Sequence, residues 1–423
     1  MHWIKQPIGL LSLLLISSQL LYAAPFVPAN DQQILETLPS DSPPPRYLNS
    51  DSFASGASTV SPEQTSQLLE RAYLQGDPRA LGQARAQLDQ MTDQSVETVM
   101  LRARALQSNH QFSEAKELLK QILSKDATNP DALLTLSSLL VVQGQFEDAM
   151  SYCKKLTDPS LRVYQLACVA QIQSMTGQLT KAKQKLSGLA AIAPGLDPST
   201  ARWIYLMQAD AALRSKDVPL ATQVFSVMDT QTVPALMARA DWLLERQEYQ
   251  EVRQLLQDHT DKDSLLLRLI SAQIKLGDPK AQQNLALIKE RIEVWKLRQE
   301  IAHIRDQATY AMLANQTDSA LKLARENWQD QRETADILLY ATAAIEAGSK
   351  KDIKLLQQFM TDTQFEYPAL ERDLRLGKLS DSSTQALSTQ TLSPQTSNTQ
   401  TLSTQTLSPQ TSNTQTSSRE TPL

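Results

Sequence analysis

The sequence is poor in the residues from which many catalytic and phosphate-binding sites are built. Its 423 residues include only 11 glycines, 4 histidines and 2 cysteines, and aromatic residues make up 5%. So few glycines disfavour folds that need many tight turns or a glycine-rich phosphate loop. A formal net charge of −5 offers no basic surface for phosphates, which argues against a nucleic-acid partner. The scarcity of aromatic and β-branched residues, beside abundant Ala, Leu, Gln and Lys, favours helices over sheets.

Catalytic motifs are also missing. The sequence contains no G-x-G-x-x-G, G-x-x-x-x-G-K-[ST], H-E-x-x-H or G-x-S-x-G. The turn from Asp258 to Asp261 contains His259 and, with Asp263, could chelate a cation weakly, although a solvated turn is the preferred interpretation. His303 lies in the charged run 289–306, which we expect to form a solvent-facing helix. We therefore expect no enzyme activity, no cofactor and no metal site.

Long apolar runs are absent except for a short one near the start. Residues 8–21 are almost wholly apolar, follow a cationic start and precede small residues. Since about 20 residues are needed to cross a bilayer, this pattern predicts a signal peptide over residues 1–23, cut after Ala23. An uncleaved anchor is the alternative, and the lack of a nearby cysteine excludes lipoprotein processing. We expect an exported, periplasmic protein (secreted as the alternative) without an integral membrane segment after processing.

Residues 24–60 form a Pro- and Ser-rich linker that is expected to be disordered, because it cannot bury enough apolar surface to offset chain entropy. One apolar island, with Ile34, Leu35 and Leu38, interrupts it. The favoured interpretation is a short helix that docks on the body, and the alternative is a partner-binding motif.

The tail, residues 377–423, is also expected to be disordered. Residues 388–402 are repeated by residues 403–417 with only the last residue changed, and no charge occurs between Asp381 and Arg419. Uncharged Ser/Thr/Gln tracts of this kind do not build a core. We interpret the tail as inert, with a glycosylated stalk or spacer as the alternative.

An internal repeat organises the body, residues 61–376. Nine turn positions follow one another at intervals of 30 to 39 residues, and each lies between two amphipathic stretches of about fourteen residues. This pattern predicts nine helical hairpins. The nine positions are Gly76, His110, Gly144, Gly177, Lys216, Gln247, Gly277, Asn315 and Gly348.

Small residues recur where the two helices of each hairpin should touch. Seven of the nine residues that stand seven places before a turn position are Ala or Ser. The second expected contact stands five places after the turn position. It is Ala in five of the nine units, and the other four have Leu81, Val252, Gln282 and Ile353. Small side chains at both places let the helix backbones approach. Asp-Pro pairs such as Asp77-Pro78 and Asp197-Pro198 predict helix starts.

The two cysteines are predicted to lie at similar heights on neighbouring antiparallel helices. Cys153 and Cys168 are placed almost symmetrically about the turn at Asp158-Pro159. In an exported protein this placement favours a disulfide, and two buried thiols are the alternative.

The segments His110-Gln111-Phe112-Ser113-Glu114-Ala115 and Gly144-Gln145-Phe146-Glu147-Asp148-Ala149 resemble tetratricopeptide repeats (TPR). The resemblance spans roughly residues 61–360 and implies an all-α, right-handed superhelical solenoid. It also implies that the second, fifth, ninth and twelfth residues of each repeat face a concave groove. The groove candidates are Glu97, Met100, Arg104, Gln107, Asp131, Leu134, Ser138, Tyr164, Gln171 and Trp203.

A mixed polar and apolar lining of this kind suits an extended peptide or a helix. We therefore expect a non-catalytic scaffold in the cell envelope that binds a protein or peptide partner in the groove. Whether Tyr164 and Trp203 line the groove or pack between hairpins stays open.

A narrower resemblance involves residues 76–82 (GDPRALG) and 323–328 (LARENW). Both are similar to an exported bacterial TPR group of unestablished function, whose members are often encoded beside a HupE/UreJ-type membrane protein linked to metal uptake. This resemblance implies the alternative function, an accessory or assembly factor for a membrane metal transporter. An envelope membrane protein would then be the partner.

Overall fold

The structure is a computed structural model that describes residues 60–229, 231–297 and 303–378. Every described residue lies in the second of the chain's two units, Val60–Leu423. The expected signal peptide, the island at Ile34 and the tandem repeats of the tail lie outside the described residues. None of the described helices is long and apolar enough to cross a bilayer.

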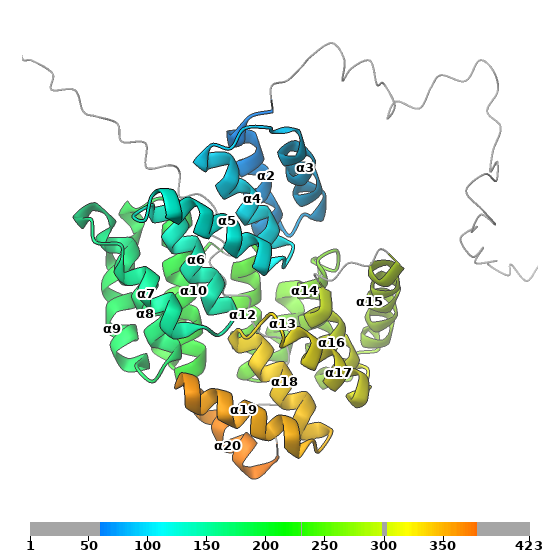
Figure 1. Cartoon of the computed structure of the whole chain (residues 1–423). Coiled ribbons are helices and arrows are strands. Elements are labelled where there is room, and N and C mark those ends of the chain that lie inside the picture. The colour runs from blue at the N-terminus through cyan, green and yellow to red at the C-terminus, as the bar shows by residue number, and fades with distance from the viewer. Residues whose placement is uncertain (1–59, 230, 298–302, 379–423) are drawn as a thin grey trace, which may run out of the picture. The chain divides into compact units, whose positions relative to one another are not determined.

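The described residues fold into nineteen α-helices that pack in sequential pairs, which confirms the predicted all-α class (Figure 1). The first helices of the pairs are α2 Pro62–Gln75, α4 Val96–Ser108, α6 Pro130–Val142, α8 Arg162–Met175, α10 Pro198–Ser215, α12 Val233–Glu245, α14 Asp263–Leu276, α16 Ile304–Leu313 and α18 Thr334–Glu346. The second helices are α3 Pro78–Gln90, α5 Phe112–Lys125, α7 Phe146–Lys154, α9 Leu179–Ile192, α11 Val218–Val227, α13 Tyr249–Leu256, α15 Lys280–Leu297, α17 Thr317–Asn327 and α19 Lys350–Thr363. A last helix, α20 Pro368–Leu376, follows the ninth pair.

All nine predicted turn positions end a first helix in the left-handed conformation, with φ between 54° and 70°. At α6 the N–H of Gln145 donates to the carbonyl of Leu140 at 2.8 Å, the bond that closes a helix whose last turn reverses at a glycine. The predicted helix starts are present too, since the carboxylates of Asp77 and Asp197 accept hydrogen bonds from the first N–H groups of α3 and α10.

The helix contacts follow the small-residue pattern in the first helices, where all nine predicted positions are buried. In the second helices the expectation is wrong for three pairs: Leu81 and Ile353 are half-buried and Gln282 is exposed. The buried residue stands one place earlier, and in two of the pairs it is an alanine, Ala80 or Ala281. These helices are rotated by one residue because a small side chain packs more closely than Leu or Gln at the crossing.

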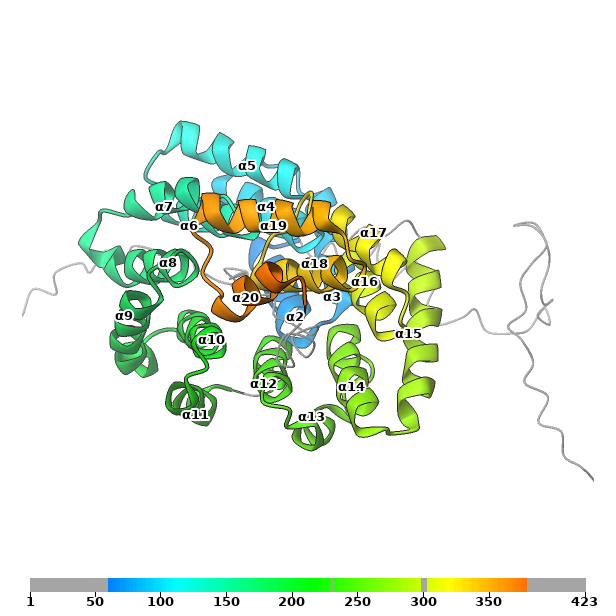
Figure 2. The same ribbon diagram turned by 90° about the horizontal axis from the view of Figure 1, so that it is seen from below.

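Contacts distant in sequence join the early pairs to the late ones. A single hydrophobic cluster contains residues from Val99 to Met175 and from Ala308 to Leu374. The N–H of Arg332 donates to the carbonyl of Val142 at 2.7 Å, and α2 packs against α12. Seen from below, α20 lies between α18 and α10 (Figure 2). The last pairs therefore pack on the turns of the third and fourth pairs.

Candidate functional site

The first helices of the early pairs share a charged and aromatic surface, which we call the inner face. Its members come from five helices and are Glu70, Arg104, Asp131, Tyr164, Arg202 and Trp203. The guanidinium of Arg202 lies 3.7 Å from the carboxylate of Glu70. The charges of Asp131 and Glu70 act on Arg104, and the charge of Asp131 also acts on Tyr164. The fold thus brings together the side chains of Glu70 and Arg202, which are far apart in the sequence.

Two buried hydrogen-bond donors, one on the inner face and one on α4 close to Arg104 in sequence, have no acceptor among the described residues. Burial lowers the pKa of Arg104 to about 10, and the carboxylates of Asp131 and Glu70 only partly offset this effect. The side-chain nitrogens Nε2 of Gln107 and Nε1 of Trp203 are buried, and within the described part of the chain neither has a hydrogen-bond partner. Because buried polar groups are nearly always bonded, these donors favour a ligand that presents acceptors.

The sequence-predicted groove residues fall into three groups. The buried ones are Met100, Gln107, Leu134, Ser138 and Gln171. The half-buried ones are Arg104, Asp131, Tyr164 and Trp203, and Glu97 is exposed in the first turn of α4. Tyr164 and Trp203 also pack against hydrophobic clusters, and that they line a groove stays a prediction.

The groove candidates predicted from the sequence did not include two members of the inner face, Glu70 and Arg202, or Tyr73 beside them. Burial raises the pKa of Tyr73 to about 12, and the charge of Arg202 acts on its hydroxyl. Glu70 and Tyr73 are the ninth and twelfth residues of the first repeat, so the same count from Gly76 identifies both. Arg202 has no such signal apart from its place beside Trp203.

Buried ion pairs occupy the first helices of the later pairs. Arg214 bonds to Asp210 and to the carbonyl of Ser174, which joins α10 to α8. In the same way, Arg268 bonds to Asp241 at 2.8 and 3.0 Å and joins α14 to α12. Such buried pairs fix the arrangement of neighbouring helices more than they stabilise the fold.

Two carboxylates of the acidic turn that was considered as a cation site, Asp261 and Asp263, form ion pairs with basic side chains. Asp263 accepts a hydrogen bond from Arg291, and Asp261 lies 3.2 Å from Lys262. Over the described ranges, no three His, Cys, Asp or Glu side chains gather closely enough to hold a metal ion.

Two histidines meet where the second pair contacts the eighth. A cavity of about 330 Å³ is lined by His110 from the α4–α5 turn, by His303 before α16, and by the starts of α12 and α14. The expectation of a solvent-facing helix for His303 is wrong. The ring of His303 stacks on buried Trp295 with 4.1 Å between centroids, since an aromatic stack removes more apolar surface from water than an exposed position would.

His110 should make stability depend on pH. Burial, with a smaller contribution from Arg305, lowers its pKa from 6.5 to about 4. Between these values the unfolded chain binds a proton that the folded chain does not, so stability is full above pH 6.5 and falls as the pH drops towards 4. We expect a loss of about 2 kcal/mol, a figure reduced from the full shift because the ring is partly exposed.

The matched variant is His110→Asn, because Asn tolerates the positive φ of 58° and does not titrate. Urea unfolding at pH 7 and pH 4.5 should show a smaller loss for the variant than for the wild type. Equal losses in the two proteins would contradict the assignment to His110.

The two cysteines are joined by a disulfide in the structure. The Cα atoms of Cys153 on α7 and Cys168 on α8 are 5.7 Å apart, and both side chains are buried. Disulfides are typical of proteins in an oxidising compartment.

The packing of helices in sequential pairs defines the class, a helical-repeat protein. Residues 106–160, from the end of α4 to the turn before α8, match the tetratricopeptide repeat family. The chain thus contains a TPR segment, a repeat that is typically non-catalytic and that binds proteins. A search of curated proteins gives no match.

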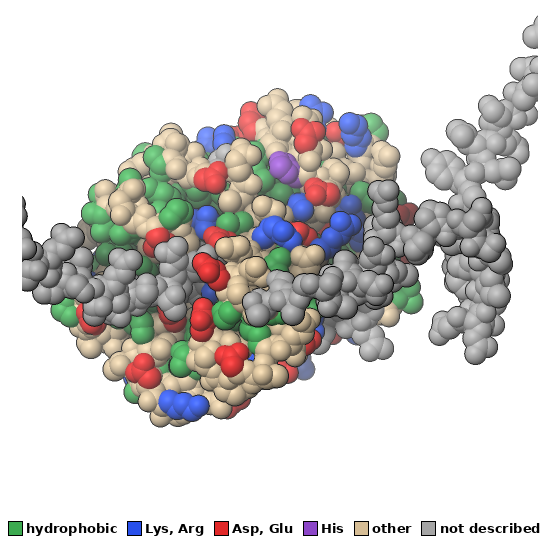
Figure 3. All heavy atoms as spheres, turned by 90° about the horizontal axis from the view of Figure 1, so that it is seen from above, with side chains coloured by type: hydrophobic (Ala, Val, Ile, Leu, Met, Phe, Trp, Pro, Cys, Tyr) green, Lys and Arg blue, Asp and Glu red, His purple; other side chains and the backbone are tan. Residues whose placement is uncertain are grey.

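Acidic and basic side chains are interspersed on the face shown in Figure 3.

Proposed function

We propose that the protein is a scaffold of the cell envelope that binds an extended segment of a partner protein along the inner face. The observation that carries the proposal is the set of buried donors without acceptors, Gln107 Nε2 and Trp203 Nε1, beside the incompletely compensated cation of Arg104. Carbonyl groups of a peptide backbone, or a carboxylate, supply the acceptors that these donors lack.

The rings of Tyr164 and Trp203 give the same surface apolar area. Both rings are half-buried and pack against hydrophobic clusters, so a bound segment could cover their exposed part. Aromatic and arginine side chains dominate the energy of protein interfaces, since they combine large apolar area with directed hydrogen bonds.

A periplasmic location is supported by the signal-peptide pattern of residues 1–23 and by the disulfide between Cys153 and Cys168. The similarity of residues 76–82 and 323–328 to exported bacterial TPR proteins supports the same location.

The test is a crosslinking pull-down from the cell envelope with the full mature chain as bait. Arg104→Ala and Trp203→Ala should each lower recovery of one dominant partner at least tenfold, because each removes a donor and its contact area from the inner face. Arg85→Ala, on the exposed side of α3, is the matched control and should recover the partner normally. Unchanged recovery with both inner-face variants would place the binding surface elsewhere.

A further inference from the structure

The helix α20 and the loop before it fill the space between first helices of distant pairs. The side chains of Phe365, Tyr367, Leu370 and Leu374 are each at most 4% exposed. Phe365 forms an isolated antiparallel bridge with Thr176 at the end of α8, and the N–H of Glu366 donates to the carbonyl of Met175 at 2.9 Å. Residues 364–376 therefore pack as an extended strap followed by an amphipathic helix.

Tyr367 faces the charged residues of α10 and α12. The charges of Asp210 and Arg214 on α10 and of Asp241 and Glu245 on α12 act on its hydroxyl, and burial raises its pKa. Asp373, further along α20, is fully buried, and its charge acts on the carboxylate of Glu245. Hence the strap pairs with the end of α8, and Tyr367 lies near the charged residues of α10 and α12; seen from below, α20 lies in front of these helices, next to α18 (Figure 2).

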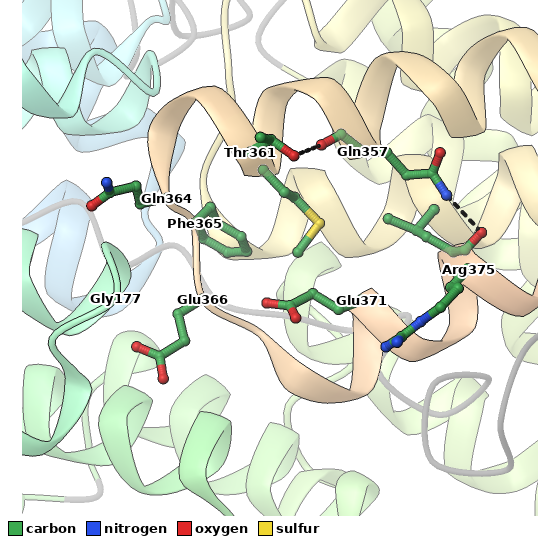
Figure 4. A pocket seen from close by; sticks show the side chains of 10 residues that line it. Gly177, Gln357, Thr361, Gln364, Phe365, Glu366, Glu371 and Arg375 are labelled. Atoms are coloured by element: carbon green, nitrogen blue, oxygen red, sulfur yellow. Dashed lines mark hydrogen bonds between the residues drawn. The ribbon is translucent and has the colours of Figure 1, made fainter.

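The opposite side of α20 is exposed. Glu371 and Arg375 are exposed and line a pocket of about 500 Å³ between α20, α19 and the α8–α9 turn (Figure 4). One side-chain bond, from Nε2 of Gln357 to the carbonyl of Leu374 at 3.0 Å, crosses from α19 to α20. A terminal helix with one packed face and one open face belongs to the least stable part of a fold.

We infer that α20 and its strap occupy a binding surface of this protein at the end of α8 and near α10 and α12. An amphipathic helix of a partner protein binds there by replacing them. This partner helix follows aromatic residues and has leucines four residues apart. This inference rests on the proposed function, and it adds to the inner face a second binding surface, the one that now contacts residues 364–376. The end of α8, which pairs with Phe365 and Glu366, and the charged residues of α10 and α12 near Tyr367 already accommodate a segment of this chemistry. The internal copy competes at high effective concentration, so α20 inhibits binding until it is displaced.

The test uses the full chain and a fluorescent peptide of residues 364–378 as the probe. The variant Tyr367→Ala/Leu370→Ala loosens the inward side of the segment, and Glu371→Ala/Arg375→Ala is the matched control on its outward side. We expect fluorescence anisotropy to show at least tenfold tighter peptide binding to the inward variant than to the wild type or the control. Hydrogen exchange should show protection of α10 and α12 on addition of the peptide.

Equal binding of the peptide to all three proteins would overturn the inference, as would tight binding without protection of α10 and α12. Should the inward variant lose its helical signal, Glu366→Ala replaces it, because that change removes only the carboxylate that accepts from the N–H of Leu179 at 3.4 Å. At least threefold tighter binding is then expected, and no change overturns the inference. A partner that binds the inner face while hydrogen exchange of α20 stays unchanged would overturn the inference and leave the proposed function standing.

Discussion

Replacing Arg305 by alanine should destabilise the protein by about 3–5 kcal/mol, the usual cost of leaving buried charges without their partner. The guanidinium of Arg305 bonds to both carboxylate oxygens of Asp336, at 2.6 and 2.8 Å, and to Glu333 at 2.8 Å. Asp336 is 2% exposed and Glu333 is 4% exposed. Without the arginine, two carboxylates would share one buried site at the junction of α16 and α18.

The matched control is Arg325→Ala. Arg325 also bonds to a carboxylate on the next helical pair, that of Asp352 at 2.6 and 2.9 Å, but 47% of its side chain is exposed. Asp352 keeps hydrogen bonds from the hydroxyls of Tyr340 and Ser349 when the arginine is removed. Urea unfolding should therefore show at least twice the loss for Arg305→Ala as for Arg325→Ala. Similar losses for the two variants would mean that burial does not set the cost.

The repeat pattern predicted the local part of the fold because it is set by neighbouring residues. Each turn position lies between two amphipathic stretches, so Lys216, Gln247 and Asn315 could be assigned as turn positions although none of them is a glycine. The repeat pattern alone does not fix the register of the second helix, since this register depends on which of two adjacent residues is small. The correction from Leu81 to Ala80 illustrates this limit.

Contacts between early and late pairs could not be predicted in this way. They depend on the small rotation between successive pairs, which accumulates over several repeats and has no local sequence signal. The bond from Arg332 to Val142 and the packing of Phe365 beside Thr176 are results of that rotation. For the same reason, nothing in the repeat pattern indicates that residues 364–376 pack against the end of α8.

The disulfide between Cys153 and Cys168 should contribute roughly 3 kcal/mol, since it closes a loop with a sequence separation of 15 residues in the unfolded chain. Both sulfurs are buried near the hydroxyl of Ser137, so a reductant reaches them mainly when the α7–α8 region opens. Urea unfolding of the wild type with and without reductant should differ by that amount. The Cys153→Ala/Cys168→Ala variant is the control, and its unfolding should not respond to reductant. If the wild type unfolds at the same urea concentration in both conditions, the crosslink does not constrain the unfolded chain, and the helical packing alone holds this hairpin junction together.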